Sequence, residues 1–475
     1  MTKVCKLLLL SVLVILQACS DNDDNDDALF EAAPTICTGT EMKPERLFLQ
    51  QVSASSAIVK WRGDAEKLCF GTEMGKLDNE VTATVTETEH SEALLTGLDA
   101  DTTYYYSVGA ASSGTDQQKL HTAPATGSVP GDGNIRVWII GDSGEADDNA
   151  AAVRDGYLTY NASSGGEDAD LFLMLGDNAY TEGTDAQHQA AVFDMYPDIL
   201  NKTPVWPTIG NHEMGSLGIS SSADINSYTL LDEESEADPG SNPPYLNIFS
   251  LPMNAEAGGI ASGTEQYYSF DYGNLHVVSL DSQVAARDDT NRATMRQWLI
   301  DDLAANTSDW TIVIFHHPPY TKGSHDSDND LGGIDQPIFA MREEFNPIFE
   351  QNGVDLIYSG HSHAYERSYY LQGHTGLSDT FDPAVHTELN DGGQAASGQD
   401  GEAYSQIAKS GMDDKAVYTV AGSSSKATFG SVDHPANFFG MLEIGSVVVD
   451  LNASRLDARF IDVNGDVLDF VTITR

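Results

Sequence analysis

Six apolar runs, each leading into a turn rich in Asp, Asn or His, limit the fold of this chain more than any other feature. They read IRVWIIGDSG, DLFLMLGDNAY, PVWPTIGNHE, LHVVSLDS, WTIVIFHHPP and VDLIYSGHSH. Continuous apolar runs of this kind are typical of strands buried on both faces of a sheet. Helical stretches are expected between them, over residues 147–160, 185–200, 290–305 and 339–351. The pattern predicts an α/β domain over residues 135–475.

The end of the chain is rich in further strands. AVYTVAG, SVVVDL, LDARFID and VLDFVTIT alternate between apolar and polar residues or are wholly apolar. We expect this tail to form a second sheet stacked on the first. Two stretches rich in Gly, Ser and Asp, residues 214–266 and 374–412, are expected as insertions beside the ligand-binding edge, where loops of such length shape specificity or cover a site.

The strand ends of this domain carry metal-binding side chains. Strands of an α/β sheet deliver their last residues to one edge, where ligands bind. That edge receives Asp142, Asp177, Asn211, His212, His316, His317, His361 and His363. Each one alone has a structural explanation, such as a turn, a cap or a buried histidine. Together they offer more Asp, Asn and His ligands than one first-row metal ion needs, which indicates two ions about 3.5–4 Å apart.

Five ordered blocks, GD, GDxxY, GNHE, VxxH and GHxH, resemble the signature of purple acid phosphatases, a branch of the calcineurin-like metallophosphoesterases. Here they are Gly141-Asp142, GDNAY, GNHE, VIFH and GHSH. The resemblance implies an α/β four-layer sandwich of two β-sheets flanked by helices. It also implies two sets of metal ligands: Asp142, Asp177, Tyr180 and His363 for the first ion, and Asp177, Asn211, His316 and His361 for the second.

The tyrosine of GDNAY narrows the expected metals. A phenolate ligand requires a strongly acidifying ion, because the ordinary pKa of tyrosine is about 10. Most relatives in the wider metallophosphoesterase group lack this tyrosine. Tyr180 therefore favours Fe(III) paired with Fe(II), Zn(II) or Mn(II), the alternative being a tyrosine that merely packs beside an ordinary dinuclear site.

Further roles follow from the same resemblance. His212 is expected to face the substrate phosphate, and His325, in TKGSHD, to be a second substrate-side histidine or else a solvated loop residue. His317 is expected to support the ligands, and Glu213 to bond His212 or cap the next turn. Arg367 and Lys322 either attract phosphate or form ion pairs with carboxylates.

The function implied is an acid phosphatase that hydrolyses phosphate monoesters through a metal-held hydroxide. A phosphodiesterase or nucleotide hydrolase on the same centre is the alternative. A surface binding or adhesion protein with a vestigial metal domain is a third possibility, which the complete ligand set disfavours. With 73 acidic against 24 basic residues, a net charge of −49, the chain is not expected to bind nucleic acid.

The N-terminus predicts export. Residues 1–18 form a short basic region and an apolar run too short to span a bilayer, as in a signal peptide. The run ends in LQACS, which resembles a bacterial lipobox with Cys19 as the lipidated residue. The acidic residues 19–33 read as a disordered tether. We therefore expect an exported bacterial lipoprotein, anchored to a membrane and facing the periplasm or the cell surface.

Residues 34–124 consist of short alternating strands and turns, and LTGLDADTTYYYSVGA resembles both fibronectin type III sandwiches and the N-terminal domain of plant-type purple acid phosphatases. Trp61 and Tyr106 are expected in its core. Cys37 and Cys69, an even pair in an oxidising compartment, predict a disulfide. Residues 125–134, rich in Pro and Gly, read as a linker to the catalytic domain.

Overall fold

The computed structural model describes residues 37, 39, 42–86, 90–110, 117–214, 243–283, 285–329, 335–387, 397–406 and 415–475. The expected signal peptide, Cys19 and the acidic tether lie outside these residues. So do residues 215–242, 388–396 and 407–414, which make up much of the two expected insertions. No helix within the described ranges is long and apolar enough to cross a membrane.

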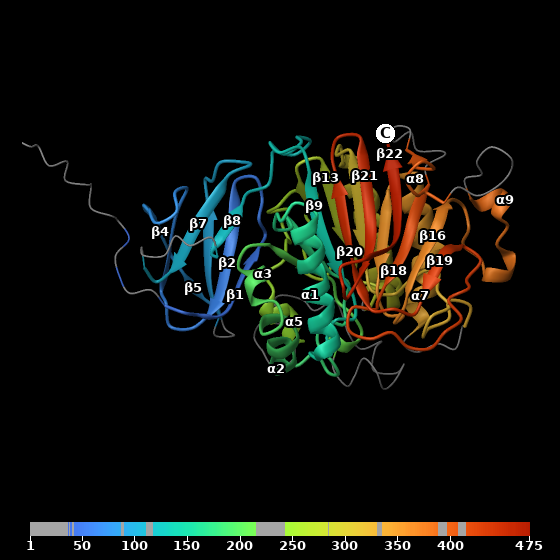
Figure 1. Cartoon of the computed structure of the whole chain (residues 1–475), viewed down its shortest axis with the longest axis horizontal. Helices are drawn as coiled ribbons and strands as arrows, with labels where there is room; N and C mark the ends of the chain where they lie inside the picture. Colours follow the sequence, from blue (N-terminus) through green and yellow to red (C-terminus); the bar gives the residue numbers. More distant parts are fainter. Residues whose placement is uncertain are drawn as a thin grey trace, which may run out of the picture. The chain divides into compact units, whose positions relative to one another are not determined.

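The N-terminal segment is an all-β sandwich of two four-stranded sheets (Figure 1). The first has the order β1 (Glu45–Gln50), β2 (Ser56–Arg62), β6 (His90–Thr96), β5 (Thr84–Val85). The second has the order β4 (Asn79–Thr82), β3 (Lys67–Gly71), β7 (Thr103–Val108), β8 (Lys119–His121). Alternate residues of β2 and β7 face inward, so Trp61 and Tyr106 are fully buried in the shared core, as expected.

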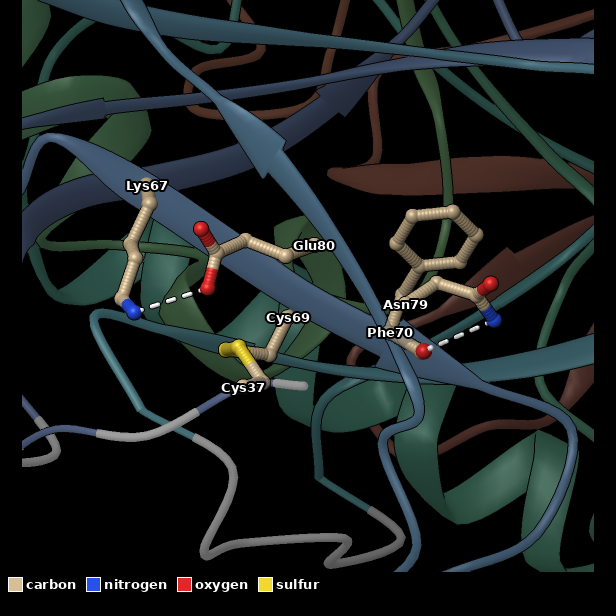
Figure 2. The surroundings of a disulfide bond; sticks show 6 residues. All are labelled: Cys37, Lys67, Cys69, Phe70, Asn79 and Glu80. Carbon is tan, nitrogen blue, oxygen red and sulfur yellow. Dashed lines mark hydrogen bonds and ion pairs between the residues drawn. A yellow bond between two sulfur atoms is a disulfide. The ribbon is translucent and has the colours of Figure 1, made fainter. Parts of the chain in front are cut away.

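A disulfide joins Cys37 to Cys69 of β3, with their Cα atoms 6.0 Å apart (Figure 2). The bond ties the segment that precedes β1 to the second sheet. Both half-cystines are buried against Leu77. The predicted pairing is therefore the one present in the structure.

Over the residues that the structure describes, the α/β domain contains two seven-stranded sheets. The first has the order β11 (Val205–Pro207), β10 (Leu171–Met174), β9 (Ile135–Ile140), β20 (Gly445–Leu451), β21 (Arg455–Asp462), β22 (Val467–Thr474), β17 (Tyr404–Ser405). The second has the order β12 (Tyr268–Tyr272), β13 (Leu275–Ser279), β14 (Trp310–Ile314), β15 (Leu356–Ser359), β18 (Ala416–Ala421), β16 (Tyr365–Leu371), β19 (Asn437–Met441). This is the two-sheet α/β fold that the sequence predicts.

The expectation that the tail forms a sheet of its own is wrong. Strands β20, β21 and β22 extend the first sheet, where β20 pairs antiparallel with β9. Strand β18 instead joins the second sheet, parallel to β15. Local strand patterns do not encode pairing partners, and the free edge of β9 is satisfied here by a strand far along the chain.

Side-chain alternation in β14 shows how the layers stack. Ile312 and Ile314 point into the core that the two sheets share. Val313 points the other way, into a cluster formed with Leu299 and Phe349 of the covering helices. On the outer side of the first sheet, α1 (Asp148–Ser163) packs against β20 and β21. Each sheet is therefore covered by helices on one face and by its partner sheet on the other.

Besides α1, the described residues form α2 (Asp185–His188), η1 (Gln189–Phe193), α3 (Pro197–Leu200), η2 (His212–Met214), α5 (Pro244–Ile248), η5 (Ala285–Arg287), α6 (Asp289–Ala305), α7 (Gln336–Ala340), η7 (Met341–Phe345), α8 (Asn346–Gln351), η8 (Ser378–Thr380) and α9 (Pro383–His386).

The expected helices 147–160 and 290–305 are present as α1 and α6, which contain no proline. The expected helices 185–200 and 339–351 are each divided. Pro197 and Pro347 lack the N–H that would continue the α-helical bonding, and the chain forms π-helical turns before them.

Candidate metal centre

Tight turns after β9, β10 and β15 bring the candidate ligands together. Asp142, Asp177 and His361 all adopt left-handed backbone conformations, with φ of 53°, 52° and 66°. Such conformations are uncommon for residues other than glycine and cluster at functional sites. The GNHE turn requires glycine at position 210, because a Cβ atom there would lie 2.2 Å from the backbone nitrogen of Asp177. Small residues and strained turns thus allow the loops to approach one another closely.

The first group of donors surrounds Tyr180. Its hydroxyl lies 3.1 Å from Asp142 Oδ1 and 3.3 Å from Asp177 Oδ2. His363 Nε2 lies 3.3 Å from the same hydroxyl and 3.5 Å from Asp142 Oδ1. Burial, followed by the charges of Asp142 and Asp177, raises the pKa of the Tyr180 phenol well above its ordinary value. These are the four residues expected on the first metal.

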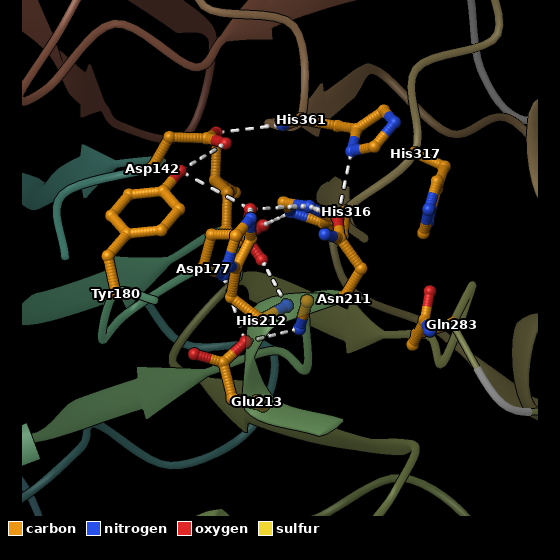
Figure 3. Close-up of polar contacts among 12 residues, drawn as sticks. Asp142, Asp177, Tyr180, Asn211, His212, Glu213, Gln283, His316, His317 and His361 are labelled. Carbon is orange, nitrogen blue, oxygen red and sulfur yellow. Dashed lines mark hydrogen bonds and ion pairs between the residues drawn. The ribbon is translucent and has the colours of Figure 1, made fainter. Parts of the chain in front are cut away.

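The second group of donors surrounds Asn211. Its Oδ1 lies 3.0 Å from His316 Nε2 and 3.0 Å from His361 Nδ1. His316 Nε2 also lies 3.4 Å from Asp177 Oδ2. Figure 3 shows these side chains converging with Asp142 and Tyr180 from loops of both sheets. Asp177 Oδ2 belongs to both groups, so one carboxylate oxygen stands between them.

The donor spacing fits two metal ions. Two donors bound to one ion at about 2.0–2.2 Å, with roughly octahedral or tetrahedral angles, lie about 3–3.5 Å apart. The separations within both groups fall in this range. The ligand atoms of Asp142, Asp177 and His316 also lie within 4.8 Å of one another, and all three residues are buried. Burial alone would keep His316 neutral, yet the charge of Asp177 raises the pKa of His316 to about 9, so the cluster attracts positive charge.

Hydrogen bonds at the far ring nitrogens select the tautomers that metal binding requires. His316 Nδ1 donates to the Leu175 carbonyl oxygen at 2.9 Å, so Nε2, which faces Asn211 and Asp177, is the atom that would bind a metal once its own proton is displaced. His361 Nε2 donates in the same way to Asp335 Oδ1 at 2.9 Å, which leaves Nδ1 free to bind a metal. Metal-binding histidines are commonly oriented by such outer partners.

Glu213 holds the two ligand loops together, and this differs from the expectation that it bonds His212 or caps a turn. Its carboxylate accepts the backbone N–H groups of Asp177 at 2.9 Å, Asn178 at 2.6 Å and Gly210 at 2.6 Å. The side chain is fully buried, and burial, followed by the charge of Asp177, raises the pKa of Glu213 to about 7. Glu213 therefore fixes the turn of GDNAY against the turn of GNHE.

His212 stands at the open side of the centre. Its Nδ1 donates to the Thr181 carbonyl oxygen at 2.7 Å, and its Nε2 faces Asp177 Oδ2 at 3.8 Å. The ring also contacts Tyr180 edge-on, with ring centroids 4.5 Å apart. The side chain is 21% exposed. His212 therefore presents a partly exposed ring beside the shared carboxylate of Asp177.

His325 lies beside the centre and is held by a residue that sequence reasoning missed. Its ring stacks on that of His361 with centroids 3.8 Å apart, and its Nδ1 donates to Asp335 Oδ1 at 2.7 Å. Asp335 thus accepts from both histidines. Burial opposes ionisation of Asp335, but the two hydrogen bonds hold its pKa below the usual range. Asp335 precedes a helix in the motif-free sequence GGIDQP, so no sequence signal marks it.

His317 packs behind the ligands. Its ring is fully buried, lies 4.4 Å from the His361 ring centroid, and bonds Ser282 Oγ at 2.9 Å. Ser282 Oγ also accepts the His316 backbone N–H at 3.2 Å. The His317 ring also lies 5.0 Å from the His316 ring centroid, and Figure 3 shows it on the side of the ligands away from Tyr180. It packs against the ligand rings and makes no hydrogen bond to a ligand side chain in the described part of the chain.

The phosphate-attracting role considered for Arg367 is wrong. Its guanidinium is 1% exposed and binds Asp469 through two contacts of 2.6 and 3.0 Å. Lys322 forms ion pairs with Asp326 at 2.6 Å and Asp328 at 2.8 Å. Both basic side chains therefore form ion pairs with carboxylates, which outnumber basic groups in this chain. Lys426, which pairs with Glu145 at 2.5 Å, does approach the ligands, and its Nζ lies 3.6 Å from the centroid of the Tyr180 ring.

Two family comparisons match this architecture. Residues 44–122 match the purple acid phosphatase N-terminal domain, and residues 135–365 match the calcineurin-like phosphoesterase family. Purple acid phosphatase 22 of Arabidopsis thaliana is 27% identical over 343 residues, which cover 68% of this chain and 65% of that protein. The chain spans 48% to 65% of the length of the first three curated relatives.

Two solved structures share the fold. Purple acid phosphatase PPD1 from yellow lupin (Lupinus luteus) has a TM-score of 0.64 at 17% identity, with 91% of this chain and 74% of that chain covered. PhoD has a TM-score of 0.58 at 14% identity, with 93% and 90% covered. The solved structures share the fold, and the two family matches show that the chain carries a purple acid phosphatase N-terminal domain followed by a calcineurin-like phosphoesterase domain.

Proposed function

We propose that this protein is a metal-dependent acid phosphatase that hydrolyses small phosphate monoesters. One observation carries the proposal: two groups of donors, each spaced to hold one ion, share Asp177 Oδ2. Two ions held by these residues would supply positive charge for the oxygens of a phosphoryl group and would make a water molecule more acidic.

The chain's own residues position the substrate and move a proton. In the reaction, the oxygen of water forms a bond to phosphorus while the ester P–O bond breaks, and the products are the alcohol and inorganic phosphate. His212 Nδ1 is committed to the Thr181 carbonyl, so Nε2 is the atom that donates a proton to the departing alkoxide oxygen. His325, whose Nδ1 is held by Asp335, presents Nε2 as a second proton-bearing or phosphate-contacting group.

The metals we propose are Fe(III) in the first site with Fe(II), Zn(II) or Mn(II) in the second. The first group contains a phenol and two carboxylates, which are hard oxygen donors suited to a highly charged ion. The second group contains two imidazoles and a neutral amide besides the shared carboxylate, which suits a divalent ion. Elemental analysis and the visible spectrum test this assignment: Y180F should abolish a phenolate-to-iron absorption band while both ions stay measurable.

Two variants test the proposed activity. D177N removes the shared carboxylate and should abolish both metal binding and turnover. H212A leaves the donor groups intact and should reduce turnover about 10²- to 10⁴-fold while the metal content stays at the wild-type level. Full turnover by D177N contradicts the dinuclear mechanism, and loss of metal from H212A contradicts the role of His212.

Matched substrates test the kind of ester. A chromogenic phosphate monoester should be hydrolysed faster than the corresponding diester. Preference for the diester would instead favour the phosphodiesterase alternative on the same centre. A protein that binds no metal and hydrolyses neither ester would be a binding protein.

We also propose that the protein is exported and anchored to a membrane through a lipid on Cys19. The lipobox-like LQACS and the acidic residues after it support this placement. The disulfide between Cys37 and Cys69 is consistent with an oxidising compartment. Labelling with a radioactive fatty acid in a bacterial host should mark the wild type and leave C19A unlabelled; equal labelling of both would contradict the anchor.

A further inference from the structure

A segment beside the metal centre, residues 426–432 (the rim segment), contacts the ligands of the first metal site. Lys426 Nζ lies over the Tyr180 ring, and the backbone N–H of Thr428 donates to the carbonyl oxygen of His363 at 3.0 Å. At its other end, the backbone N–H of Val432 donates to the Lys322 carbonyl oxygen at 3.0 Å. The rim segment therefore runs from the GDNAY loop, past the GHSH loop, to the loop that carries His325.

Close packing locks the middle of the rim segment in place. A Cβ atom on Gly430 would lie 2.4 Å from the carbonyl oxygen of Gly323. A Cβ atom on Gly323 would in turn lie 2.3 Å from Oγ of Ser362, the residue between the two GHSH histidines. Val432 adopts a φ of 46°, which is unfavourable for a β-branched residue, so its surroundings rather than its own preference hold this conformation.

This locked backbone presents Phe429 to solvent. Phe429 is 76% exposed, the largest exposed fraction among the large hydrophobic side chains of the described residues. Its Cα lies about 3.8 Å from those of Thr428 and Gly430, the two residues that contact His363 and Gly323. The ring contributes little to the core, yet its backbone is fixed against the motif that carries two metal ligands. An exposed ring on a fixed support is suited to stack against a planar ligand.

We propose that Phe429 is a specificity residue that stacks on a planar aromatic leaving group, so that the preferred substrates are phosphate monoesters of aromatic alcohols or of nucleosides. The inference rests on the proposed phosphatase function and adds the substrate class. With the phosphoryl group at the donor groups, the leaving group extends outward past the His363 loop, and the Thr428 backbone N–H bonds that loop one residue before Phe429. An aromatic ring or a nucleobase gains stacking energy there, and an aliphatic alcohol does not.

Three phosphate monoesters test the proposal on the full-length, metal-loaded protein. Phenyl phosphate and adenosine monophosphate carry planar rings, and glycerol phosphate carries none. F429A should lower kcat/KM for the ring-bearing esters about tenfold and change that for glycerol phosphate less than twofold. A fall for both ring-bearing esters supports recognition of any aromatic ring, and a fall for adenosine monophosphate alone supports a nucleobase. V85A, which truncates a 67% exposed residue of the N-terminal sandwich, is the control and should change none of the three. An equal fall for all three esters, or no fall for any, overturns the proposal.

A binding measurement separates this inference from the activity. F429W should show fluorescence quenching that saturates with phenylphosphonate, which cannot be hydrolysed, and little quenching with propylphosphonate at equal concentration. If the wild type hydrolyses no ester, the proposed function fails, and the phosphonate comparison still decides whether residue 429 contacts a ring. Equal quenching by both phosphonates contradicts the stacking role.

Discussion

The carboxylate of Glu213 offers the most direct test of how the two ligand loops are held together. E213A deletes the acceptor of three buried backbone N–H groups, which belong to Asp177, Asn178 and Gly210. A buried donor left without a partner costs about 1–3 kcal/mol. Because the site is fully buried and a cavity replaces the side chain, we expect E213A to lose on the order of 5 kcal/mol of unfolding free energy.

E213Q separates the hydrogen bonds from the volume of the side chain. The amide keeps one acceptor oxygen and turns an N–H₂ group toward at least one backbone donor, so part of the clamp is lost while the cavity is avoided. We expect a loss of about 2 kcal/mol, between the wild type and E213A. Metal content should fall in the same order, because the clamped turn carries Asp177, the shared ligand.

Urea unfolding followed by tryptophan fluorescence measures the first effect, and elemental analysis of purified protein measures the second. E145A, which truncates a carboxylate that pairs with Lys426 at the surface, controls for loss of negative charge near the site. If E213A unfolds within about 1 kcal/mol of the wild type and keeps both metals, the clamp does not hold the loops and the reasoning is refuted.

Three further predictions concern other parts of the molecule. D335N should weaken the hydrogen bonds that orient His361 and His325, so the affinity for the second ion should fall about 10- to 100-fold. D326N is the control and should change this affinity little. Equal affinities of D335N and the wild type would contradict the positioning role of Asp335. Burial raises the pKa of the Glu350 carboxyl group from 4.5 to about 7, so between these pH values the folded protein holds a proton that the unfolded chain releases. The unfolding free energy that this group contributes below pH 4.5 should therefore be lost as the pH rises through 7, by about 3 kcal/mol. E350Q should flatten this part of an unfolding-versus-pH curve, and an unchanged slope would show that another group is responsible. The double variant C37S/C69S, which opens a link across 32 residues, should lose about 3 kcal/mol in denaturant unfolding, and an unchanged midpoint would show that the bond adds no stability.

The sequence predicted the elements that depend on local pattern and spacing. Each apolar run before a GD, GN or GH turn is a strand, and the residues after Gly141, Gly176 and Gly360 do meet at one edge. What it could not predict depends on contacts distant in the chain. Asp335 has no motif, because its role arises only where two histidines from separate loops face it. The ion pair was one of the two roles considered for Arg367, but its partner Asp469 could not be predicted, since it lies on a strand whose place in the sheet no local pattern encodes.

The place of β9 in its sheet also governs the order in which the protein can fold. The strand that leads into Asp142 is flanked by β10, made soon after it, and by β20, which pairs Val447 with Ile139 near the end of the chain. During synthesis from the N-terminus, β9 therefore waits with one edge open until almost the whole chain exists. Contacts of such long sequence separation form slowly, and an open apolar edge in the interval favours aggregation. A chain truncated before β20 should therefore acquire neither the complete first sheet nor a stable pair of metals, even though every proposed metal ligand would already be present.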